Sequence, residues 1–240
     1  MTDNDLLFVV VPYAAIALLI VVTILRWRFA PFTVSSMSSQ LLESRRLFWG
    51  SISFHWGISL ILTGHFLALL VPRGFEIFHG VRFQTLLLEI TGLALGLWTL
   101  FGIIVLIVRR IQVPRIKAVT TPMDAVVLGL LFLQIITGLW IAIGYRWGSF
   151  WGVSVFVPYV RSLLTLSPQP ELVAALPWVL KTHVLSFFVF IAVFPFTRLV
   201  HIVTLPLGYL TRPRQKVVRT IPVNRPYEPV GDDLGRSSQS

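Results

Sequence analysis

The chain has 240 residues, of which 55% are hydrophobic and only 12% are charged, and its mean hydropathy is +0.81. A soluble domain carries about 25% charged residues, so this composition excludes an ordinary soluble protein and indicates an integral membrane protein. The sequence contains no cysteine, which excludes disulfides, iron–sulfur clusters held by this chain and covalent haem attachment.

Five apolar segments are long enough to cross a bilayer as helices, which takes about 20 mostly apolar residues each. They cover residues 6–25, 48–71, 83–108, 123–144 and 176–205. None shows the alternation of a β-barrel strand. We therefore predict an all-α integral membrane domain, a bundle of five transmembrane helices, over residues 1–210, followed by a basic, polar tail over residues 211–240. Asp3 and Asp5 precede the first segment where a signal peptide would be basic, so we expect that segment to remain as a helix.

The basic residues predict the orientation of the bundle. Fourteen of the 20 lysines and arginines lie on one side, after the first, third and fifth segments. Because basic residues mark the cytoplasmic side, we expect the N-terminus outside and the C-terminus in the cytoplasm. The net charge of +10 is thus explained by membrane topology and not by a nucleic-acid partner. The aromatic-rich outer segment 145–170 is expected to lie along the membrane interface.

Four of the five histidines lie within or at the end of the apolar segments: His55 and His65 on the second, His183 and His201 on the fifth. Ionisable residues at membrane depth are costly and usually functional, and imidazole is a common axial ligand of haem iron. The two segments run in opposite directions, so His55 shares the cytoplasmic level with His201, and His65 the outer level with His183. This pattern predicts two bis-histidine b-type haems. Hydrogen bonding between helices is the alternative, but it explains four such residues poorly.

The histidine spacings on the two segments are unequal. His55 and His65 are about 15 Å apart along their helix, whereas His183 and His201 are about 27 Å apart along theirs. Pro195 lies between the second pair and is expected to kink that helix, which reduces the mismatch.

Glycines in two segments suggest close approaches. Gly92 and Gly96 form a pair of the small-xxx-small type, which lets another helix or a flat ring come near. Gly57 and Gly64 flank the histidines of the second segment, and we expect them to make room for porphyrin.

Four stretches resemble the gamma subunit of membrane-bound respiratory nitrate reductase, over about residues 10–220: SSQLLESRR, FHWGISLILTGHFLALLVP, RRIQVPRIKAVTT and FPFTRLVHIVTLPLGYLTR. The resemblance implies that His55 and His201 ligate the haem nearer the cytoplasm and that His65 and His183 ligate the outer haem. It also implies a place in the cytoplasmic membrane, where quinol is oxidised near the outer haem. Electrons then reach an iron–sulfur beta subunit and a molybdenum-containing alpha subunit, which carries the nitrate chemistry.

Quinol oxidation releases protons, so it needs an acceptor near the outer surface. The candidates for the quinol site are Arg82, Gln84 and Glu89, with Glu76 and His79 as further proton acceptors. Family members can carry a lysine at the outer start of the third helix, where this chain reads VRFQ. Arg82 can orient a quinone oxygen or merely extend to the interface. We interpret His79 as a solvated loop residue, with contact to a quinone headgroup as the alternative.

Three arginines, Arg109, Arg110 and Arg198, lie near the level of His201 and are candidates for pairing with haem propionates. The alternatives are a purely topological role or contact with a partner subunit. The cytoplasmic segments 30–47 and 109–117 and the tail after residue 211 are predicted to dock that partner, with binding to anionic lipid as the alternative.

Other functions compatible with these residues are a similar diheme subunit of a nitrite-oxidising, sulfur or heterodisulfide oxidoreductase and, from a different class, a haem-free membrane anchor or transporter. A spectrum showing b-type haem or none separates the two classes.

Overall fold

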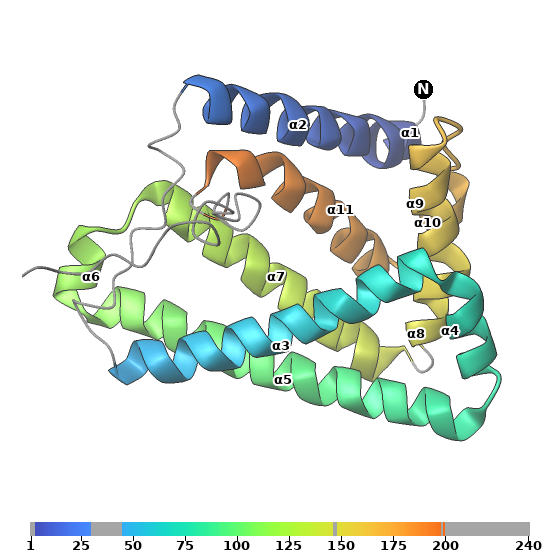
Figure 1. The fold of residues 1–240 in the computed structure, drawn as a ribbon, viewed down its shortest axis with the longest axis horizontal. Helices are drawn as coiled ribbons and strands as arrows, with labels where there is room; N and C mark the ends of the chain where they lie inside the picture. Colours follow the sequence, from blue (N-terminus) through green and yellow to red (C-terminus); the bar gives the residue numbers. More distant parts are fainter. Residues whose placement is uncertain (1–2, 30–44, 146–147, 198, 200–240) are drawn as a thin grey trace, which may run out of the picture. The chain divides into compact units, whose positions relative to one another are not determined.

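The computed structural model describes residues 3–29, 45–145, 148–197 and 199, and every regular element within these ranges is helical (Figure 1). Five helical segments are long and apolar enough to cross a membrane, and each overlaps one of the predicted spans: Asp3–Phe29, Leu47–Leu70, Arg82–Gln112, Pro122–Gly144 and Trp178–Phe196. The predicted all-α bundle of five spans is confirmed, and the chain is a multi-pass membrane protein.

The first span is built from α1 (Asp3–Asp5), the π-helical η1 (Leu6–Val10) and α2 (Val11–Phe29). The second span lies in α3 (Arg45–Leu70), the third is α5 (Arg82–Gln112) and the fourth is α7 (Pro122–Gly144). The fifth is α11 (Trp178–Val193), which ends in the 3-10 turn η4 (Phe194–Phe196).

Shorter helices connect the spans. At one end of the bundle lie α4 (Pro72–His79), α8 (Gly148–Trp151), the π-helical η3 (Gly152–Phe156), α9 (Val157–Leu164) and α10 (Glu171–Ala174). We call this the outer end, after the orientation predicted from charge. At the other end, α6 (Pro114–Ala118) joins α5 to α7. A proline begins α4, α6 and α7, a position where its missing N–H costs no helical hydrogen bond.

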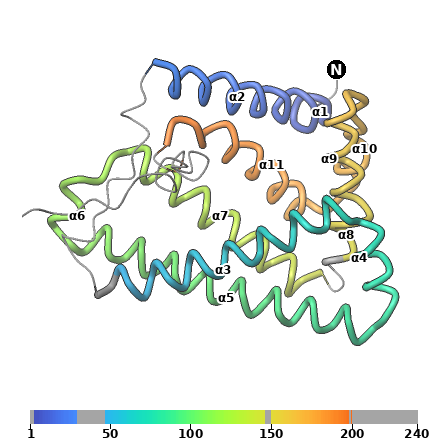
Figure 2. Tube along the Cα trace, viewed as in Figure 1, coloured from blue at the N-terminus to red at the C-terminus, as the bar shows by residue number. Residues whose placement is uncertain are grey.

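The long helices pack in the succession α3, α5, α7, α11 and α2, and the contact of α3 with α5 is the most extensive (Figures 1 and 2). The two helices that carry the described membrane histidines, α3 and α11, are therefore connected mainly through α5 and α7.

Glycine allows the close approach of α3 to α5. A Cβ atom added at Gly102 would lie 2.8 Å from the Phe54 Cα and 2.9 Å from the Gly50 carbonyl oxygen. These are backbone atoms that cannot turn aside, so only glycine fits. Gly57 likewise faces Thr99 of α5, with the Leu95 carbonyl oxygen 3.2 Å from the added Cβ. The expectation that Gly57 makes room for porphyrin is therefore wrong, because α5 fills that space.

Of the other glycines singled out in the sequence, one lies at a helix contact and two do not. A Cβ at Gly96 would lie 2.8 Å from the Leu139 side chain of α7, which confirms a helix contact at that position. A Cβ added at Gly92 or at Gly64 would meet no atom of the described residues within 4 Å. The expected close approach at Gly92 is therefore not formed by the described residues, whereas the space beside Gly64 is open.

The aromatic outer segment, residues 145–170, contributes a buried side chain to the core of the bundle. Tyr159 is fully buried in a cluster of apolar side chains from η1, α2, α9, α10 and α11. Its hydroxyl donates to the Phe8 carbonyl at 2.7 Å. In an α-helix that carbonyl would accept from residue 12, which is Pro12 and has no N–H. Burial, and then the neighbouring Tyr13, raises the pKa of Tyr159 well above its ordinary value, so the phenol stays protonated and keeps donating.

Replacing Tyr159 by phenylalanine should destabilise the outer end, because it removes the donor to a buried carbonyl. We expect a loss of about 1–3 kcal/mol in the free energy of unfolding, measured by denaturant titration in detergent. Tyr145→Phe is the control, since the described residues provide no hydrogen bond to the Tyr145 hydroxyl and its ring lies against Trp151. Equal stability of the two variants would show that the bond to Phe8 contributes nothing.

The helix of the fifth span is interrupted inside the predicted segment 176–205. The described helix runs to Phe196, and Thr197 has an extended backbone, with φ −96° and ψ 174°. Most of the segment beyond Thr197 lies outside the described residues. The physical reason for the interruption is Pro195, which cannot donate within a helix, together with the Arg26 guanidinium, which donates to the carbonyls of Pro195 and Thr197. A straight rise of about 27 Å from residue 183 to residue 201 therefore does not apply. His201 itself lies outside the described residues.

Candidate membrane histidine site

The two histidines of α3 are held in the same way. The Nδ1 atom of His55 lies 2.7 Å from the Ser51 carbonyl oxygen, and the Nδ1 atom of His65 lies 2.9 Å from the Ile61 carbonyl oxygen. A carbonyl only accepts, so each Nδ1 carries the proton and each Nε2 carries a lone pair. Both side chains are exposed, and within the described ranges neither Nε2 has a hydrogen-bond partner. Metal-binding histidines are oriented in this manner, with the other ring nitrogen bonded to a carbonyl.

His183 lies on α11 against α7, and its partners are side chains. Its Nδ1 is 2.8 Å from the Thr137 hydroxyl, and its Nε2 is 3.2 Å from the Gln134 amide nitrogen. Ser186 donates to the oxygen of the same amide. The absence of a side chain at Gly138 lets the imidazole approach α7, because a Cβ there would lie 3.2 Å from the His183 ring.

His65 and His183 are the described members of the predicted outer pair. His65 lies five residues before the end of α3 at Leu70, and His183 lies five residues after the start of α11 at Trp178, so both are within two turns of the outer end of the bundle. Gly64, beside His65, leaves open space. The predicted partner of His55, His201, lies outside the described residues, as does Arg198.

The donor set fits a b-type haem. In the ranges that the structure covers, no group of three or more His, Asp or Glu side chains is placed to hold a free metal ion. A haem contains four nitrogen ligands of its iron, so the protein needs to provide axial ligands only. Two imidazoles from different helices could provide them. The lone pair on Nε2 of His65, the common level of His65 and His183 and the space beside Gly64 fit that requirement.

The three quinol-site candidates lie on the first turns of α5. Arg82 is exposed, whereas Gln84 and Glu89 are half-buried. Arg82 and Glu89 are seven residues apart and share one face of the helix, and Gln84 lies off that face. The antiparallel contacts of Gly57 with Thr99 and of Gly102 with Phe54 fix the register of α3 on α5. If the same antiparallel pairing continues toward the outer end, Glu89 of α5 lies opposite residue 67 of α3. Along the helix axis, Glu89 is then within one helical turn of the level of His65.

His79 is not a solvated residue, in contrast to our interpretation of the sequence. It ends α4, where it is half-buried, and its Nδ1 lies 2.6 Å from the Phe75 carbonyl oxygen. Its ring packs against the rings of Phe75 and Phe150. Glu76, on the same short helix, is exposed.

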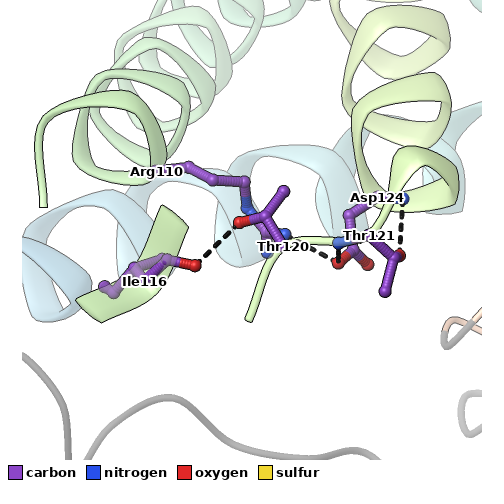
Figure 3. A network of polar contacts seen from close by, with 5 residues as sticks. All are labelled: Arg110, Ile116, Thr120, Thr121 and Asp124. Carbon is purple, nitrogen blue, oxygen red and sulfur yellow. Dashed lines mark hydrogen bonds and ion pairs between the residues drawn. The ribbon is translucent and has the colours of Figure 1, made fainter. Parts of the chain in front are cut away.

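The two described propionate candidates have different surroundings. Arg109 is buried, with 3% of its surface exposed. Arg110 forms an ion pair with Asp124 at 2.9 Å, and Asp124 caps α7 through reciprocal bonds with Thr121 (Figure 3). Arg110 thus joins the end of α5 to the start of α7. Of the predicted docking segments, residues 109–117 are described, most of 30–47 is not, and the tail after 211 lies outside the described residues.

Gln134 and Thr137 are the site residues that the sequence analysis missed. Gln134 is the one strongly polar side chain in the apolar stretch 125–144 of the fourth span. The rule that singled out the histidines, the cost of polar groups at membrane depth, applies to it equally. The sequence could therefore have identified Gln134 as a candidate site residue. Only the packing of α7 on α11 shows that it contacts His183.

The fold and the site define a class, a multi-pass helical membrane protein with oriented histidines inside its spans. The family model of the nitrate reductase gamma subunit matches residues 4–220, and the chain belongs to that family. Members of this family are subunits of oxidoreductase complexes whose catalysis lies on other subunits.

Individual relatives agree with this assignment. The chain is 30% identical over 219 residues to the nitrate reductase gamma chain of Bacillus subtilis, covering 88% of this chain and 96% of the relative. It is 30% identical over 218 residues to the respiratory nitrate reductase 1 gamma chain of Escherichia coli, covering 89% and 96%. It is also 33% identical over 236 residues to the nitrate reductase-like protein NarX of Mycobacterium tuberculosis, covering 92% of this chain and 36% of that longer protein.

Proposed function

We propose that the chain anchors a nitrate reductase in the cytoplasmic membrane and transfers electrons to it from quinol through two b-type haems. The observation that carries the proposal is the placement of His65 and His183 at one level of the bundle. His65 has a proton-bearing Nδ1 bonded to a carbonyl and a lone pair on Nε2, and His183 on another span lies at the same outer level. The membership of the chain in the gamma subunit family supports the same function.

The residues of the chain have distinct roles in this proposal. His65 and His183 hold the outer haem, and His55 and His201 hold the haem nearer the cytoplasm. When bound, the haems supply one-electron redox centres between the outer face and the partner subunits. Arg109, whose side chain is buried, and Arg110, which is paired with Asp124, are the described candidates to pair with a propionate.

Quinol oxidation removes two electrons and two protons, so the outer end must accept protons. Glu89 is placed for this task, because it is half-buried and the register of α3 on α5 sets it within a turn of His65. A carboxylate at that depth can take a proton from the quinol hydroxyl and pass it outward. Arg82, on the same face and exposed to the outer side, can orient a quinone oxygen.

The electrons need acceptors on the cytoplasmic side. The partners in this proposal are an iron–sulfur beta subunit and, beyond it, a molybdenum-containing alpha subunit that reduces nitrate. The basic cytoplasmic segments would dock the beta subunit, since an electron-transfer partner must approach the haem near His55 closely.

Purification of the chain with its attached subunits tests the function. We expect reduced b-type bands in the absorption spectrum, about two haems per chain by pyridine haemochrome analysis, and reduction of nitrate by added quinol. A chain without haem would be an anchor or transporter and would overturn the proposal. A diheme chain attached to a sulfur, nitrite or heterodisulfide enzyme would retain the electron-transfer role and refute the nitrate assignment.

A further inference from the structure

We propose that Thr137 is the positioning residue of His183 and sets the redox potential of the haem that His183 ligates. This inference rests on the proposed haem ligation. The first observation is the 2.8 Å contact between the Thr137 hydroxyl and the His183 Nδ1. His55 and His65 use backbone carbonyls in the equivalent place, so of the described membrane histidines His183 is the one oriented by a side chain of another helix.

The direction of the hydrogen bond follows from the neighbours of Thr137. Its hydroxyl oxygen lies 2.8 Å from the Leu133 carbonyl and 3.2 Å from the Gln134 carbonyl, both in its own helix. Carbonyls only accept, so the hydroxyl proton points back into α7. The Thr137 oxygen is then free to accept from His183, and Nδ1 must be the protonated nitrogen.

The contact of Gln134 agrees with the same tautomer. Its amide oxygen accepts from Ser186, whose hydroxyl also lies 3.1 Å from the His183 carbonyl oxygen, and its amide nitrogen lies 3.2 Å from the His183 Nε2. With the amide in this orientation the nitrogen donates and Nε2 carries the lone pair. The direction of the bond at Thr137 is therefore what assigns the proton to Nδ1. Binding of a haem at Nε2 would require the Gln134 amide to give up its contact, because one lone pair does not serve two partners.

The bond to Thr137 has an electronic consequence. An Nδ1–H that donates to an oxygen makes the opposite nitrogen a stronger electron donor, and a stronger axial donor favours the ferric state. Loss of the hydroxyl should weaken Nε2 as a donor and allow the ring to turn. The potential of that haem alone should rise.

The test uses redox titration and low-temperature electron paramagnetic resonance on the complete complex. Thr137→Val keeps the shape and removes the hydroxyl. We expect it to retain both haems, to raise the midpoint potential of the haem that is lost in His183→Ala, and to shift the low-spin signal of that haem. The other haem should be unchanged. Thr137→Ser retains the hydroxyl and should restore both the potential and the signal.

Thr91→Val is the matched control. The Thr91 hydroxyl also bonds to carbonyls of its own helix, Leu87 at 2.7 Å and Leu88 at 3.0 Å, and no described contact joins it to a histidine. It should leave both potentials unchanged. The inference is overturned if Thr137→Val has wild-type potentials, or if Thr137→Ser behaves like Thr137→Val. If His183→Ala retains both haems, the ligand assignment itself fails, and the role of Thr137 fails with it.

Discussion

Replacing His65 or His183 by alanine is expected to remove the same haem and to abolish quinol oxidation. The two side chains lie at the same outer level of the bundle, and the loss of either would leave the proposed haem with only one of its two histidine ligands. Haem content should fall from about two to about one per chain in both variants, with the same component missing from the redox titration. His55→Ala should instead leave that haem in place and remove the other one.

The fifth histidine provides the control for this series. His79 makes the same type of contact, from Nδ1 to the carbonyl four residues earlier, at 2.6 Å. It belongs to α4, outside the spans, and packs between two phenylalanine rings. His79→Ala should retain both haems. If His65→Ala and His183→Ala lacked different haems, the pairing across α3 and α11 would be wrong.

Gly102→Ala is expected to disrupt the contact between α3 and α5. The added methyl group would overlap the Phe54 backbone and approach the Gly50 carbonyl oxygen to 2.9 Å. No side chain can rotate away, so the helices must separate along their longest interface. Overpacking costs about 1–3 kcal/mol in a soluble core and occasionally more, and we expect the upper end here because two backbones are involved. Thermal unfolding in detergent, followed by size-exclusion profile, measures the loss.

Gly92→Ala on the same helix is the matched control. Nothing lies within 4 Å of a Cβ at that position, and alanine is a better helix former than glycine by about 1 kcal/mol. Gly92→Ala should therefore be as stable as the natural protein or slightly more so. Similar stability of the Gly102 and Gly92 variants would refute the close backbone contact. Loss of the haem assigned to His55 in the proposed function, in Gly102→Ala alone, would show that the same interface supports the site.

The sequence by itself determined the class of fold and the histidines of interest. A span is a local property, about 20 consecutive apolar residues, so composition along the chain is enough to find all five. The positions of His55, His65 and His183 inside those spans stand out for the same reason, because membrane depth makes any ionisable side chain unusual.

The tertiary structure decided what depends on the neighbouring helix. Gly57 and Gly64 read alike in the sequence, yet α5 fills the space at Gly57 and leaves it open at Gly64. The break in the helix of the fifth span follows from Pro195 together with Arg26, a residue far away in the chain. The partner of His183, Thr137, is visible only once α7 packs on α11. Such contacts join residues distant in sequence, and no local pattern encodes which helix faces which.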